Sequence, residues 1–262
     1  MRKLCLGLSF AAMVLLAACG GDNGSSADDF VESSSSGESL SSSKNVVLVD
    51  PSIVVVGTMT DPRDGQTYRT VKIGNQTWMA ENLNYRYLGP TDDLDSSSFC
   101  YDDDPANCET YGRLYLWSAA MDSAGIIEGN TANGCGYNSE CSPSGNVRGV
   151  CPQGWHLPSN CDEFETLFEA VGGQEVAGAM LKSTSGWNSN GDGTDAYGFS
   201  AFPAGARNID SGFRNLGNNV TFWSSTEIGS NVYSMYLNYS YERAFLEDDG
   251  KDFALSVRCL KD

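Results

Sequence analysis

The sequence is poor in histidine and in positive charge. It has one histidine, His156, and 16 Lys and Arg against 34 Asp and Glu, so its net charge is −18. A surface of this sign repels a phosphate backbone, which excludes nucleic-acid binding as an expected function. No two cysteines have the CxxC spacing, and with one histidine the chain lacks the residues for a structural zinc site.

Long apolar runs are also missing, apart from one at the N-terminus. Arg2 and Lys3 precede a stretch of fifteen mostly apolar residues, 4–18, which is too short to span a bilayer. The stretch ends in small residues followed by Cys19, as in bacterial lipoprotein signals. We therefore expect residues 1–18 to be removed and Cys19 to carry lipid. The chain would be exported and anchored to the cell envelope, in the outer membrane, with the membrane as its partner.

The segment after Cys19 has little that could build a core. Residues 20–44 contain ten Ser, four Gly and five acidic residues. Such a composition buries too little apolar surface to offset the entropy of ordering. We expect residues 19–45 to be a flexible tether and residues 46–262 to form one domain.

Seven cysteines remain in the predicted domain, and an exported chain favours disulfides among them. Short spans rich in turn formers suggest Cys100 with Cys108 and Cys135 with Cys141. Cys151 and Cys161 then compete for Cys259. Spacing alone does not decide between them.

The apolar periodicity predicts an α+β domain with helices in its first half and antiparallel strands in its second. A hairpin is expected at 67–73 and 77–80. The predicted helices cover 114–124, 159–172 and 175–182. The predicted strands cover 197–202, 220–224, 232–239 and 253–260, with Tyr233, Met235, Leu237, Tyr239 and Tyr241 on one face of the third.

Several segments together resemble one family, the Fibrobacter succinogenes major paralogous domain. They are Gly57–Tyr68, Gln76–Asn84, Tyr111–Tyr115, Cys151–Ser159, Tyr197–Ser200, Phe222–Glu227 and Ser256–Cys259. The resemblance implies an exported protein with a twisted antiparallel sheet, similar to C-type-lectin-like and formylglycine-generating-enzyme-like folds. It also implies that Cys151 pairs with Cys259, as a bridge joining the chain ends of lectin-like domains, and leaves Cys161 as a free thiol.

The residues indicate little chemistry. His156 lies between Trp155 and Leu157 and is expected to be a packing residue rather than a catalytic base. The tripeptides with which lectins bind calcium and sugar are absent. Asn188, Asn190, Asp192 and Asp195 place oxygens at alternate positions and are the weak candidates for Ca²⁺; otherwise no cofactor is expected. Trp187, next to this polar loop, is the tryptophan we select as a stacking platform for a ligand.

These observations favour a non-enzymatic binding module for a polysaccharide or envelope glycan. Two alternatives stay open: a hydrolase or oxidative modifying enzyme on the same fold, and a purely structural envelope lipoprotein. The sequence leaves the oligomeric state undetermined.

Overall fold

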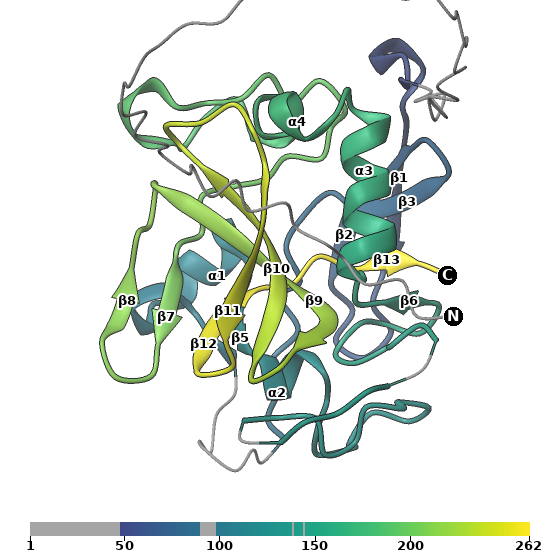
Figure 1. The fold of residues 1–262 in the computed structure, drawn as a ribbon, viewed down its shortest axis with the longest axis vertical. Coiled ribbons are helices and arrows are strands. Elements are labelled where there is room, and N and C mark those ends of the chain that lie inside the picture. Colours follow the sequence, from purple (N-terminus) through teal and green to yellow (C-terminus); the bar gives the residue numbers. More distant parts are fainter. Residues whose placement is uncertain (1–47, 90–97, 138, 144) are drawn as a thin grey trace, which may run out of the picture. The chain divides into compact units, whose positions relative to one another are not determined.

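A computed structural model describes residues 48–89, 98–137, 139–143 and 145–262, except the side chains of Asn160 and Cys161. Contacts divide the chain into residues 1–45 and residues 46–262. The predicted signal at 1–18, the lipidated Cys19 and the tether at 19–45 lie outside the described residues. The second unit is an α+β domain built mainly from strands (Figure 1).

The smaller sheet joins the start of the domain to its end. Its strand order is β1-β2-β3-β13-β6. The bounds are β1 Val55–Thr60, β2 Thr67–Ile73, β3 Gln76–Met79, β6 Trp155–His156 and β13 Leu260–Lys261. The β2–β3 hairpin is the predicted one, and its turn requires Gly74, whose φ is +61°. Short β13 places the last residues of the chain between β3 and β6.

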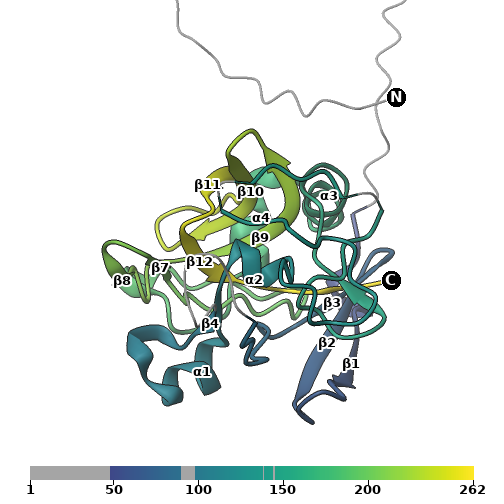
Figure 2. The same ribbon diagram turned by 90° about the horizontal axis from the view of Figure 1, so that it is seen from below.

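The larger sheet contains most of the strands in the second half of the chain. Six strands run in the order β11-β10-β9-β12-β5-β4, and β7 joins β12 and β8. The bounds are β4 Ser98–Phe99, β5 Leu114–Leu116, β7 Ala206–Asn208, β8 Gly212–Arg214, β9 Asn219–Ile228, β10 Asn231–Asn238, β11 Phe245–Gly250 and β12 Phe253–Ser256. Figure 2 shows the smaller sheet to one side of this larger one.

The central strands of the larger sheet are buried on both faces. Phe222 contributes to one apolar core, together with Trp78 and Phe164, whereas its neighbour Trp223 contributes to the other. The same alternation runs along β5, where Leu114 and Leu116 enter the first core and Tyr115 enters the second. Because successive side chains of a strand point to opposite faces, such strands contribute large apolar side chains to both cores.

The helices are short. They are α1 Pro105–Tyr111, α2 Trp117–Ala120, α3 Glu165–Ala170, with a π-helical turn at Asn160–Phe164 before it, and α4 Gln174–Leu181. Three 3-10 turns lie at Pro51–Ile53, Tyr101–Asp103 and Asn188–Asn190. None of the helices in the described part of the chain has the length and apolar character needed to cross a membrane.

Local sequence explains where α1 begins and ends. The carboxylate of Asp104 accepts a hydrogen bond from the backbone N–H of Ala106, and Pro105 occupies the first helical position. Gly112 ends the helix at φ +72°. The helix was not predicted, because its one buried residue is Cys108 and it therefore lacks an apolar stripe.

Two predicted elements are wrong. Residues 114–124 begin as strand β5, and only Trp117–Ala120 is helical, because a strand buried on both faces shows the same dense apolar run as a buried helix. Residues 197–202 form no strand and make only an isolated bridge between Ala201 and Lys182. Helix α4 and the turn leading into α3 agree with the predicted ranges, although both lie beyond the midpoint of the chain.

A β-bulge corrects the predicted face of β10. The register between β9 and β10 shifts between Val232 and Ser234. Met235 and Leu237 are buried as predicted, but Tyr233 is only half-buried and Tyr241 is 52% exposed. The buried positions before the bulge are instead Val232 and Ser234.

Among the residues whose side chains the structure describes, three disulfides close loops of the domain. They join Cys100 to Cys108, Cys135 to Cys141 and Cys151 to Cys259. These are the three predicted pairings. The third spans 108 residues and ties the chain before β6 to the chain before β13. The side chain of Cys161 is outside the described set, so its free thiol stays a prediction.

Candidate functional site

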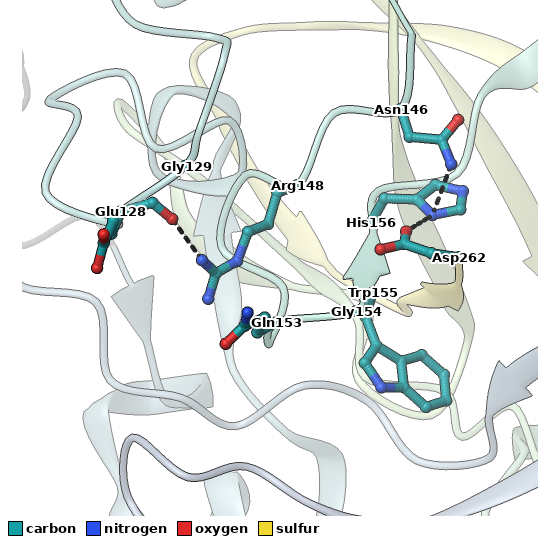
Figure 3. A pocket seen from close by; sticks show the side chains of 9 residues that line it. All are labelled: Glu128, Gly129, Asn146, Arg148, Gln153, Gly154, Trp155, His156 and Asp262. Atoms are coloured by element: carbon teal, nitrogen blue, oxygen red, sulfur yellow. Dashed lines mark hydrogen bonds and ion pairs between the residues drawn. The ribbon is translucent and has the colours of Figure 1, made fainter.

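An open polar cavity of about 580 Å³ lies where the long loop after α2 meets the end of the chain. Figure 3 shows its lining: Glu128, Gly129, Asn146, Arg148, Gln153, Gly154, Trp155, His156 and Asp262. The first six belong to the loop, the next two form β6, and Asp262 follows β13. Its size is in the usual range of small-molecule sites.

Strand pairing fixes His156 at one side of this cavity. β6 and β13 pair His156 with Leu260 and Trp155 with Lys261, and the N–H of Asp262 donates to the carbonyl of Gly154 at 3.0 Å. Trp155 and His156 are therefore held by backbone hydrogen bonds. Both are buried, with 6% and 3% exposed.

Two carboxylates hold the imidazole of His156. Its Nε2 lies 2.8 Å from Oε1 of Glu163, and its Nδ1 lies 2.7 Å from Oδ1 of Asp262. The side-chain amide nitrogen of Asn146 is 3.3 Å from the same Nδ1. Both ring nitrogens thus face an acceptor, an arrangement that favours the doubly protonated ring.

The pKa values follow from this geometry. Burial lowers the pKa of His156, but hydrogen bonds and charge from Glu163 and Asp262 outweigh it, so the pKa is raised. Burial raises the pKa of Glu163, but hydrogen bonds from His156 and from the N–H of Ser159, at 2.6 Å, outweigh it, so that pKa is lowered. An imidazolium with both N–H groups bound has no lone pair with which to accept a proton.

Arg148 is the second cation of the cavity, and main-chain carbonyls hold it. Its Nε donates to the carbonyl of Cys151 at 3.2 Å and its Nη1 donates to the carbonyl of Glu128 at 2.5 Å. Among the residues that the structure describes, no carboxylate lies within ion-pair distance of this guanidinium. Burial, followed by the charge of Arg63, lowers the pKa of Arg148.

The loop that carries Arg148 is fixed on both sides. Before Arg148, the carbonyl of Val147 accepts the N–H of Leu157 at 2.9 Å; after it, the N–H of Val150 donates to the carbonyl of Ala120 at 2.8 Å, and Cys151 is disulfide-bonded. Gly149, between Arg148 and Val150, has φ +52°, and a Cβ there would lie 2.1 Å from the carbonyl oxygen of Ala120. A glycine is therefore required at this position.

Trp187 does not offer the predicted stacking surface. Its side chain is only 5% exposed and belongs to the first apolar core. Its Nε1 donates to Oγ of Ser183 at 3.1 Å, and the ammonium of Lys182 lies 5.1 Å from its ring centroid. The polar loop that follows Trp187 in sequence made it look exposed, but the indole turns inward.

The candidate calcium ligands make local hydrogen bonds. Asp192 accepts the N–H of Trp187 at 3.0 Å, and Asp195 accepts both the N–H and the hydroxyl of Ser200, at 2.7 and 2.6 Å. The side-chain amide of Asn188 donates to Asn218 at 2.9 Å. Within the described ranges no group of three or more His, Cys, Asp and Glu residues gathers as a metal site would.

Sequence reasoning singled out His156 but missed its neighbours. Asp262 is 106 residues from His156, and Arg148 is one of 16 basic residues in the chain. Only the pairing of β6 with β13 brings His156 and Asp262 together. A weak signal for Arg148 existed, because it is a lone cation in a Gly- and Asn-containing loop just before Cys151.

Comparison with known proteins identifies the domain. The family described as the Fibrobacter succinogenes major domain matches residues 71–261, which span β2 to β13 and nearly the whole cavity lining. No curated protein matches the chain, and no solved structure matches it. On the strength of this match over most of its length, the chain belongs to the Fibrobacter succinogenes major domain family.

Proposed function

We propose that this protein is a non-enzymatic binding module for a polysaccharide or envelope glycan, anchored through lipid on Cys19 to the outer membrane and separated from it by the tether at 19–45. The lectin-like architecture implied by the sequence resemblance is part of the same proposal. The observation that carries it is the polar cavity beside β6.

The lining of the cavity suits sugar hydroxyls. Each hydroxyl both donates and accepts a hydrogen bond, so a sugar needs both kinds of group around it. The amides of Asn146 and Gln153 supply both kinds, Arg148 donates, and Glu128 accepts. A binding pocket of this kind needs few such groups if they converge on one space.

The state of His156 supports a binding role over catalysis. A hydrolytic mechanism that used the only histidine would require a free ring nitrogen as base. Both nitrogens instead contact carboxylates, at 2.8 and 2.7 Å. In this proposal His156 fixes Asp262 and the cavity wall, and the ligand leaves unchanged.

Retention on glycans tests the proposal. The full chain, purified in detergent with its own N-terminal segment, is incubated with insoluble cellulose, insoluble xylan and a glycan array. We expect retention on at least one glycan, and at least a fivefold loss in Asn146→Ala/Gln153→Ala, because exposed amides that bind sugar contribute about 1 kcal/mol each.

The matched control is Ser230→Ala/Asn231→Ala, which changes a separate cavity of about 350 Å³. This variant should bind as the parent does. Absence of retention on every glycan would favour the purely structural lipoprotein and overturn the proposal. A shortened glycan released from the resin would instead favour the hydrolase.

A further inference from the structure

The guanidinium of Arg148 makes no direct ion pair with a carboxylate of the described residues. In a chain with 34 acidic residues, a partly buried arginine ordinarily has a carboxylate partner. Here its protein partners are two backbone carbonyls, those of Glu128 and Cys151. Neutral carbonyls satisfy N–H groups without balancing the charge.

The remaining donors of Arg148 are free for a ligand. With Nε and one N–H of Nη1 engaged, Nη2 and the second N–H of Nη1 have no partner among the described residues. The two carbonyl contacts also fix the plane of the guanidinium, so little side-chain entropy is lost when a ligand binds. A planar, pre-oriented fork of donors is the group that pairs best with a carboxylate.

The nearby acids do not fill this role. Asp262 contacts the imidazole of His156 instead. Glu128 lines the cavity but contributes its carbonyl to Arg148, and Figure 3 shows its carboxylate turned away from the guanidinium. His156 already contacts two carboxylates, so Arg148 is the cation of this cavity that makes no ion pair within the described part of the chain. Asp61, Asp122 and Asp262 act on its charge only from a longer distance.

We infer that the cavity selects glycans that carry a carboxylate, such as uronic acid residues, and that Arg148 is the residue that pairs with that carboxylate. This inference rests on the proposed glycan binding and names its ligand class. A ligand group with one negative charge fits this cavity better than a doubly charged phosphate ester. Glu128 and Asp262 line the same cavity and the chain as a whole is acidic, so a second negative charge would be repelled.

Two oligosaccharides that differ only in the carboxylate give the test. Calorimetric titration of the full chain in detergent uses an oligogalacturonate and the galactose oligomer made from it by carboxyl reduction. We expect the acidic oligomer to bind at least tenfold more tightly, since a charge-assisted pair is roughly twice as strong as a neutral hydrogen bond. In Arg148→Gln the two affinities should become equal within about twofold.

Two further variants separate this role from a general effect of charge or folding. Arg148→Lys keeps the charge but not the planar fork, so it should retain only part of the preference. Arg243→Gln removes an exposed arginine paired with Glu175 and should bind as the parent does. Each variant is compared with the parent by thermal unfolding.

The outcomes distinguish the two proposals. Equal or tighter binding of the neutral oligomer by the parent would overturn the inference and leave glycan binding intact. Binding of the carboxylated glycan that is unaffected by Arg148→Gln in the folded variant would also overturn it. A sulfated oligomer that binds more tightly than the carboxylated one would do the same. Absence of binding to every glycan would overturn both proposals.

Discussion

At the residue scale, some buried charged groups of this domain are held by residues far away in the sequence. Arg258 is fully buried and donates to Asn82 at 2.6 Å, 176 residues away, and its guanidinium lies over the ring of Phe199. Partners so far apart in the sequence cannot be predicted from sequence spacing. The disulfides that join nearby cysteines could be predicted in that way. This is why His156 was recognisable from its type and its two carboxylates were not.

The contacts of His156 predict a pH dependence of stability. Folding raises the pKa of His156, so its contribution is fully present below about pH 6.5 and is lost as pH rises through the folded pKa. Folding lowers the pKa of Glu163, so its contribution is present above about pH 4.3 and is lost as pH falls. The extra stability should therefore be greatest between about pH 5 and 6.5.

His156→Gln measures that contribution. In urea unfolding near pH 6, the free energy of unfolding should fall by about 1.5–3 kcal/mol, the usual size for hydrogen bonds to charged groups. The difference between parent and variant should shrink as pH rises through the raised pKa of the folded His156, where the ring of the parent loses its charge. A difference that does not change with pH would show that folding leaves the pKa of His156 unshifted.

The ion pair between Lys251 and Glu227 predicts a second effect at this scale. Their side chains are 3% and 10% exposed, the ammonium also donates to the carbonyl of Ser139, and Glu227 accepts the N–H of Cys141 at 2.7 Å. Lys251→Met should lower the free energy of unfolding by about 3–5 kcal/mol, because it leaves the buried carboxylate of Glu227 unpaired.

The double variant Lys251→Met/Glu227→Leu serves as its control. It should recover a large part of that loss, because an apolar pair carries no desolvation penalty. Chemical denaturation of the two variants and the parent checks this. Equal stabilities of the single and double variants would contradict the account of the pair.

At the element scale, the type of an element, strand or helix, could be predicted only where one of its faces is exposed to solvent. The hairpin of β2 and β3 and the helix α4 show such patterns. β5 does not, because Leu114, Tyr115 and Leu116 enter two cores on opposite faces. The bulge in β10 depends on how β10 pairs with β9, so it could not be predicted from the sequence of β10.

The loop before β6 yields a prediction for Gly149. Gly149→Ala places a Cβ against the carbonyl of Ala120 and should move the loop that carries Arg148. We expect a loss of about 2 kcal/mol or more in stability, together with weaker glycan binding.

Gly145→Ala is the matched control for this loop. Gly145 also has a positive φ, +73°, but a Cβ at this position would meet no atom of the described residues within 4 Å, its chain neighbours aside. Gly145→Ala should lower the free energy of unfolding only through backbone strain, by about 1 kcal/mol. Thermal unfolding and glycan titration of both variants decide the matter, and equal effects would show that contact with Ala120 does not fix the loop.

At the scale of the whole domain, the Cys151–Cys259 bridge ties the cavity to the sheets. It closes 108 residues, which in the chain-entropy model contributes about 4.7 kcal/mol against a typical total of about 5–15. Cys151→Ala should therefore unfold or nearly unfold the domain. Cys161→Ala should change the stability by less than about 1.5 kcal/mol if that thiol is free.

Non-reducing peptide mapping of the native protein checks the bridge before any variant is made. The expected peptide joins Cys151 to Cys259. A peptide that joins Cys161 to Cys259 would contradict both the bridge and the predicted behaviour of the two variants.

The most direct test of the central claim is hydrogen–deuterium exchange of the full chain with and without a saturating carboxylated glycan. Ligand in the cavity should slow exchange in the loop at 146–154 and in β6 and β13, whose backbones surround it. The strands β10 and β11, which contribute no residue to the lining of the cavity, should be unchanged. Protection confined to β10 and β11, or protection nowhere, would contradict the assignment of the cavity as the binding site.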